Sequence, residues 1–267
     1  MNAVGLYFRY VGVSFRSQMQ YRWSTILSTL GVFITLALEF AAIWGLFHRF
    51  GTLRGWTLAE VALLYGIVTV GFAMAEGVAR GFDMFGNMVR MGDFDRLLLR
   101  PRPLALQVAG QELGMHRAGR AIQGAMVLGW AWTSLHLGWQ WQLLGLLGLA
   151  ILGTACLFYG IYILQATYCF WSIQSLEVFS VVTYGASETA QFPMSIYRPW
   201  FRRFFTFVMP LAAVTYYPAL PLLGRSDGTL RTPTWFGWVS PLIGVAFLLA
   251  SLWVWRFGVR HYRSTGS

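Results

Sequence analysis

The polar side chains of residues 172–192 recur at a helical spacing within a stretch that is otherwise apolar. Counted from Gln174, they follow the 3.6-residue period and therefore share one face of a predicted α-helix. The members of this polar stripe are Gln174, Glu177, Ser180, Tyr184, Ser187, Glu188 and Gln191. Polar groups inside a membrane face protein or water rather than lipid. The stripe thus either lines a water-filled path, where its glutamates would attract cations, or packs on another helix of the chain.

Two further acids lie inside apolar runs. Glu39 is a third candidate acid for such a path, although a structural contact or a subunit interface is the favoured interpretation. Glu76 is four residues before Arg80, the favourable order for a Glu–Arg pair on a helix, so we expect these two to form an ion pair.

A short segment of mixed charge, residues 80–103, separates two long apolar runs. Phe82, Phe85 and Val89 recur at i, i+3 and i+7, which predicts an amphipathic helix. Gly92 suits the position after its last turn. The charged residues around this apolar face are Asp83, Arg90, Asp93, Asp95 and Arg96. A helix that docks in a groove of a partner needs this arrangement of apolar anchors and charged rim, but a helix that merely connects two spans would show it too.

Several kinds of chemistry are not indicated. All 20 basic residues are Arg, so the chain lacks the lysine that a phosphate-binding P-loop requires. The four histidines and two cysteines are scattered and match no metal-binding or nucleophile motif. We therefore expect no catalytic, metal or cofactor site in this chain. The net charge of +10 is assigned to membrane topology rather than to nucleic-acid binding, because no basic stretch belongs to a soluble fold.

The composition predicts an all-α integral membrane protein. Hydrophobic residues make up 57% of the chain and charged residues only 11%, compared with about 25% charged in soluble domains. Continuous apolar runs of about 20 residues predict six transmembrane helices. Their expected ranges are 24–47, 58–79, 118–137, 143–171, 172–192 and 235–255. Thr57 and Glu60 form a capping-box pattern at the start of the second. We expect one domain over residues 1–267.

Two segments are predicted to touch the membrane without crossing it. Residues 6–21 mix aromatic residues with arginines, as interfacial helices do. Residues 193–231 are interrupted by five prolines into runs too short to span, which predicts two re-entrant or interfacial helices.

The arginines predict the orientation. With six spans both termini lie on one side, and the larger share of the arginines lies on that side too. These are Arg9, Arg16, Arg22, Arg80, Arg90, Arg96, Arg100, Arg102, Arg117, Arg120, Arg256, Arg260 and Arg263. The positive-inside rule therefore places both termini and the 80–103 segment in the cytoplasm.

The layout resembles the permease subunits of ABC-2-type exporters, and most closely a six-span subgroup once classed as a family of unknown function. Three stretches carry the resemblance: GDFDRLLLRPRPL at 92–104, the proline-rich region at 192–224, and WRFGVRHYRSTGS at 255–267. The resemblance implies an exporter subunit of the cell (inner) membrane that pairs with a second permease chain, identical or related. A dimer of separate ATP-binding subunits, which hold ATP and Mg²⁺, would drive it through the 80–103 segment as coupling helix.

The cargo is expected to be a hydrophobic or cationic small molecule, because the stripe is acidic, while lipid and polysaccharide cargo remain open. A secondary transporter or channel that works without ATP is the alternative. Such transporters are built from inverted repeats, and none is recognisable in this sequence.

Overall fold

The computed structural model of the protein describes residues 12–13, 16–17, 19–111, 117–172, 176–226, 233 and 235–262, and for residues 176–178 it describes the backbone only. Apart from one isolated bridge between Leu53 and Trp56, every element in these ranges is helical. The all-α class is therefore confirmed. The interfacial helix expected at 6–21 lies largely outside the described residues.

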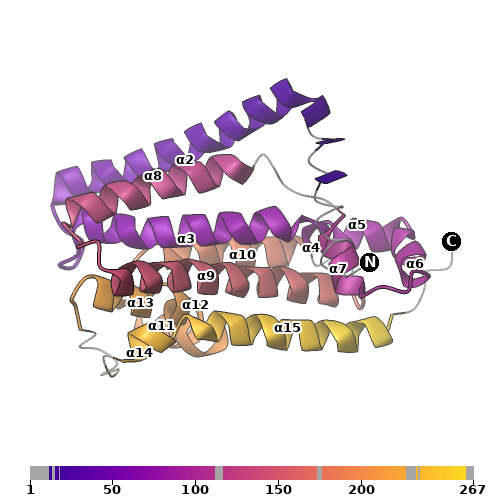
Figure 1. Ribbon diagram of the computed structural model, residues 1–267. Coiled ribbons are helices and arrows are strands. Elements are labelled where there is room, and N and C mark those ends of the chain that lie inside the picture. Colours follow the sequence, from indigo (N-terminus) through magenta and orange to yellow (C-terminus); the bar gives the residue numbers. More distant parts are fainter. Residues whose placement is uncertain are drawn as a thin grey trace.

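Six long helices form the bundle in Figure 1, and successive ones run in alternating directions. They are α2 (Arg22–Phe50), α3 (Leu58–Val78), α8 (Ala118–Ser134), α9 (Trp141–Tyr168), α10 (Leu176–Ala190) and α15 (Leu242–Arg260). Four of them, α2, α3, α9 and α15, are long and apolar enough to cross a membrane. A helix thus lies at each expected span, but α8 has 17 residues and α10 only 15. At 1.5 Å per residue these two are roughly 22–26 Å long, shorter than the other four.

α3 is the central helix. In its apolar window 78% of the residues are buried, compared with 6% for α2. Its N-terminus is closed by the expected capping box, since the Thr57 amide donates to Glu60 Oε2 at 2.8 Å and the Glu60 amide donates to Thr57 Oγ1 at 3.4 Å. α2 lies at the edge of the bundle against α8, and its outer face is apolar and exposed.

α9 and α15 approach so closely that their backbones meet. A side chain at Gly244 would lie 2.0 Å from the carbonyl oxygen of Gly153, and one at Gly153 would lie 2.5 Å from the carbonyl oxygen of Pro241. Small residues at such crossings allow tight packing between membrane helices. The C-terminal ends of this closely packed pair lie beside the 80–103 segment (Figure 1).

Short helices gather at the two ends of the bundle (Figure 1). One end holds α4 (Arg80–Asp83), α5 (Phe85–Arg90), α6 (Asp93–Leu98) and α7 (Leu104–Ala109). The opposite end holds α11 (Pro199–Arg203), η4 (Phe204–Val208), α12 (Leu211–Val214), α13 (Tyr216–Leu222) and α14 (Phe236–Val239), and η3 (Met194–Ile196) precedes α11. The single amphipathic helix expected from Phe82 to Val89 is broken at Met84 into α4 and α5.

The proline-rich region is bent as its sequence predicted. Pro199–Val208 and Leu211–Leu222 meet at 73°, a geometry that fits either a broken span or a re-entrant loop. Arg225, which follows this bend, contacts residues at the start of α3. Arg225 pairs with Glu60 at 2.7 Å, and its guanidinium lies 4.6 Å from the ring centroid of Trp56.

Candidate functional site

A buried ion cluster joins α3, α8 and α10 near the end of the bundle that carries α4–α7. Glu76 is 2% exposed and forms an ion pair with Arg117, and its other carboxylate oxygen lies 3.5 Å from Arg120 Nε. From α10, the Tyr184 hydroxyl donates to Glu76 Oε1 at 2.9 Å. Arg117 in turn donates to the Tyr184 oxygen at 3.3 Å. Two arginines therefore share one carboxylate, and α10 contributes Tyr184 to the cluster.

The cluster is incompletely hydrogen-bonded. Glu76 Oε2 and the Nε atoms of Arg117 and Arg120 are buried and have no hydrogen-bond partner among the residues that the structure describes. The Arg120 guanidinium also lies 4.9 Å from the ring centroid of Phe72, so part of its charge is stabilised by a cation–π contact. Buried polar groups of this kind are costly when unsatisfied.

The expected pair between Glu76 and Arg80 is wrong. Arg80 instead forms an ion pair with Asp83 at 2.9 Å. Spacing along one helix favoured Arg80, but Arg117 and Arg120 reach Glu76 from a neighbouring helix inside the bundle. The sequence did carry a signal for this arrangement, because two arginines at the very start of an apolar run need a partner.

The structure divides the polar stripe of α10 between two environments. Ser187 and Gln191 are buried within the chain, Ser180 is half-buried, and Tyr184 and Glu188 are exposed. The side chains of Gln174 and Glu177 lie outside the description. Ser187 and Gln191 therefore pack on the bundle, as one interpretation of the stripe expects. Tyr184 and Glu188 are exposed, and the lining of a path by the stripe stays a prediction.

Glu39 joins this outward edge. Its carboxyl group lies close to that of Glu188, which is also near Gln191 and the charge of Arg120. Three helices, α2, α8 and α10, thus bring two acids and one arginine together, next to the Glu76 cluster that shares Arg120. Of the expected path residues, Glu39, Tyr184 and Glu188 are brought near one another.

The apolar face of the 80–103 segment points inward. Phe82, Phe85 and Val89 are fully or almost fully buried in the chain's own core. Phe85 packs against Phe94 and Trp255, with ring centroids 5.0 Å away in each case. The expectation that these side chains are exposed docking anchors is corrected, because an apolar period shows that a face is covered but not by which chain. The ring partners of Phe82 and Phe85 are aromatic residues that the sequence reasoning missed: Phe94, Tyr159, Phe170 and Trp255.

The charged residues of the segment serve different contacts. Asp95 accepts a hydrogen bond from the Tyr262 hydroxyl at 3.0 Å, which ties α6 to the residues after α15. Asp93 pairs with Arg96 at 3.4 Å on an exposed surface. Gly92 is left-handed with φ 74°, as expected after a helix, and it is also the cap residue of α6, which begins at Asp93.

The outer surface of the segment is apolar and basic. Met91 is 74% exposed and Leu99 is 86% exposed. Leu98 and Arg96 are exposed as well. Arg90 and Arg100 are exposed beside them. A groove of about 460 Å³ runs along this surface between α5 and α6, with Met88, Met91 and Arg96 among its lining residues. We call Arg90, Met91, Arg96, Leu98, Leu99 and Arg100 the outer rim.

No group of His, Cys, Asp or Glu side chains within the described ranges has an arrangement that would hold a metal ion. The comparison that bears on function is with known families. The family model of the ABC-2 family transporter proteins matches residues 33–266. The chain belongs to this family. No curated protein and no solved structure matches it. Membership identifies a multi-pass membrane domain of an ABC transporter; such ABC-2 proteins are generally not enzymes themselves and work with ATP-binding subunits.

Proposed function

We propose that this ABC-2 family protein is the permease subunit of an ATP-driven exporter, which forms the translocation path and is driven by a separate dimer of ATP-binding subunits. The observation that supports it best is the two-sided packing of the 80–103 segment. The side chains of its inner face pack against the C-terminal ends of α9 and α15. On its outer rim, Met91 and Leu99 are exposed. A segment that is rigidly joined to the bundle and presents an apolar outer surface suits the transfer of force from a partner.

The membrane arrangement follows from this role. α2, α3, α8, α9, α10 and α15 are the six spans, the bent pair at 199–222 is re-entrant, and both termini and α4–α7 lie on the cytoplasmic side of the cell membrane. ATP and Mg²⁺ are held by the partner subunits. The exposed apolar face of α2, with Leu27 and Leu38 at its surface, supports contact with lipid or with a second permease chain, identical or related.

Movement of the 80–103 segment would reach the path by two routes. One runs through the aromatic contacts of Phe85 and Phe94 to α9 and α15. The other runs through α3, which ends two residues before α4 and carries Glu76 in its last turn. Because Tyr184 contacts Glu76, a shift of α3 changes the position of α10 at the outward edge of the bundle.

Replacing Leu99 by Asp tests the coupling surface. The side chain is almost fully exposed, so the substitution should leave the thermal unfolding of the permease unchanged within about 0.5 kcal/mol. A charge in the centre of an apolar contact should weaken binding of the ATP-binding subunits about 30-fold, the loss typical of an interface hot spot. The measurement is permease-stimulated ATP hydrolysis in reconstituted vesicles, titrated with the ATP-binding subunit.

Leu99→Met keeps the apolar surface and should retain full stimulation. Thr52→Asp adds the same charge in an exposed loop at the opposite end of the bundle and should also retain it. If Leu99→Asp and Met91→Asp together leave the stimulation at the wild-type level, the outer rim is not the coupling surface.

We infer further that the cargo is a hydrophobic or cationic small molecule. Arg117 and Arg120 pair with Glu76, while Glu39 and Glu188 lie close together at the edge of α2 and α10, where the charge of Arg120 also acts on Glu188. A pair of acids beside a tyrosine in an apolar setting attracts a cation and accepts an aromatic or aliphatic body.

Changing both acids together, Glu39→Gln and Glu188→Gln, should reduce ATP-dependent uptake of ethidium or tetraphenylphosphonium into inside-out vesicles at least tenfold, because the amides keep the shape and remove the charge. ATP hydrolysis without cargo should remain, since the outer rim is unchanged. Glu60→Asp at the opposite end of α3 keeps the charge there and serves as the control. Unchanged uptake of both cations by the double variant would rule out this cargo class.

A further inference from the structure

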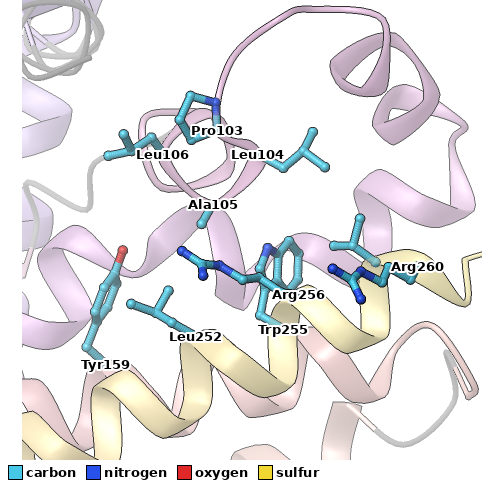
Figure 2. A pocket seen from close by; sticks show the side chains of 10 residues that line it. Pro103, Leu104, Ala105, Leu106, Tyr159, Leu252, Trp255, Arg256 and Arg260 are labelled. Carbon is cyan, nitrogen blue, oxygen red and sulfur yellow. The ribbon is translucent and has the colours of Figure 1, made fainter. Parts of the chain in front are cut away.

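A second cavity lies outside the ion cluster, where α7 faces the last turns of α15 (Figure 2). Its volume is about 550 Å³, within the usual range of about 300–1,000 Å³ for small-molecule sites. It is lined by Pro103, Leu104, Ala105, Leu106, Tyr159, Leu252, Trp255, Arg256, Val259 and Arg260. Figure 2 shows the residues of α15 on one side and Pro103–Leu106 on the other, with the Tyr159 ring at one end.

The walls of this cavity are mostly apolar and suit a hydrocarbon chain. Apart from Tyr159 and the two arginines, every lining side chain is apolar. The cavity follows α15, which is apolar enough to cross a membrane and ends at Arg260. Leu249, Trp253 and Phe257 are exposed on the same helix and face the surroundings of the bundle. The groove therefore opens beside a helix surface that the acyl chains of the bilayer already cover.

The polar edge of the cavity carries only positive charge. Arg256 and Arg260 are one helical turn apart, so they share a face of α15, and Figure 2 shows both projecting toward the cavity. Both are exposed, and neither forms an ion pair or hydrogen bond with any residue that the structure describes. They lie in the last turns of a membrane-crossing helix, the level at which lipid phosphates are found.

We propose that this cavity binds one membrane phospholipid with an anionic headgroup. An acyl chain lies in the apolar groove between α7 and α15, and the phosphate is held by the guanidinium groups of Arg256 and Arg260. Charge and shape both select this occupant, because a cation is repelled by the arginines and a polar peptide leaves the apolar walls uncovered.

Occupancy of the site has a structural consequence. Trp255 lines the cavity on one side and packs against Phe82 and Phe85 on the other, with ring centroids 5.3 and 5.0 Å away. Pro103 is the cap residue of α7, and Leu104 is the first residue of that helix. A bound lipid therefore holds the 80–109 region against α15, and anionic lipid should stabilise this part of the protein selectively. This inference does not depend on the identity of the ATP-binding subunit or of the cargo.

The test uses the full chain purified in a neutral detergent, titrated with phosphatidylglycerol or with phosphatidylcholine of the same acyl chains. Native mass spectrometry counts the retained lipid, and the thermal unfolding midpoint reports stabilisation. We expect one tightly retained phosphatidylglycerol per chain. The double variant Arg256→Gln and Arg260→Gln should bind it about 30-fold more weakly, as expected for the loss of two arginines near a lipid surface.

The matched control is Arg49→Gln with Arg90→Gln, which removes two exposed arginines elsewhere and should leave lipid retention unchanged. Ala105→Phe fills the groove while both arginines stay, so it should also release the lipid. Glycerol phosphate has the anion without the acyl chain and should give no stabilisation. Equal retention of phosphatidylcholine, equal stabilisation by glycerol phosphate, or equal loss in the two arginine pairs would each overturn the proposal.

Discussion

Replacing Glu76 by Ala should lower the free energy of unfolding by about 3–5 kcal/mol and abolish transport. The substitution leaves Arg117 and Arg120, which are largely buried, without their shared carboxylate. Removing one partner of a buried ion pair is strongly destabilising because the remaining charge is uncompensated, and inside a membrane water cannot take its place. It also removes the acceptor that holds Tyr184 of α10. The measurements are denaturant titration in detergent and transport in vesicles.

The control is Arg80→Ala, which breaks the partly buried pair with Asp83 and should cost less than Glu76→Ala, because Glu76 is the more deeply buried partner. Glu76→Gln retains the hydrogen bond from Tyr184 and should be less harmful than Glu76→Ala. In a double-mutant cycle, Arg117→Ala should partly rescue Glu76→Ala, since it removes one of the two unpaired charges. An effect of Arg80→Ala as large as that of Glu76→Ala would contradict the assigned partners.

The sequence was sufficient where structure is determined locally. The capping box at Thr57 and Glu60 depends on four consecutive residues, and it forms as predicted. The glycine that follows α5 is left-handed as predicted, because Gly92 meets the same local requirement. The long apolar runs became helices at the expected places, since a membrane leaves the backbone few other ways to satisfy its hydrogen bonds.

The sequence was insufficient where a partner comes from far along the chain. The period of Phe82, Phe85 and Val89 shows that one face is covered, but the covering residues Phe170 and Trp255 follow more than 70 residues later. Glu76 had a plausible partner at i+4, and the actual partners became visible only when α8 was placed beside α3. Likewise, a polar stripe on α10 does not reveal which of its residues the bundle covers.

Replacing Phe85 by Asp tests whether the Phe85 side chain docks on a partner or packs inside the permease. If Phe85 were a surface anchor for the ATP-binding subunit, the permease would stay folded and lose only its coupling. The structure instead places the ring within an aromatic cluster with Phe94, Phe170 and Trp255. Removing a buried Phe side chain costs about 3–5 kcal/mol, and a carboxylate in its place adds the cost of burying a charge.

We therefore expect Phe85→Asp to lower the unfolding midpoint strongly and to expose residues 80–110 to limited proteolysis in the absence of any partner. Phe85→Leu keeps an apolar side chain and should cost less than half as much, whereas Leu99→Asp on the outer rim should leave the proteolysis pattern unchanged. A Phe85→Asp permease that is as stable as the wild type but fails to stimulate ATP hydrolysis would contradict this packing. The pair of variants thus distinguishes the face of the segment that builds the bundle from the face that is available to a partner.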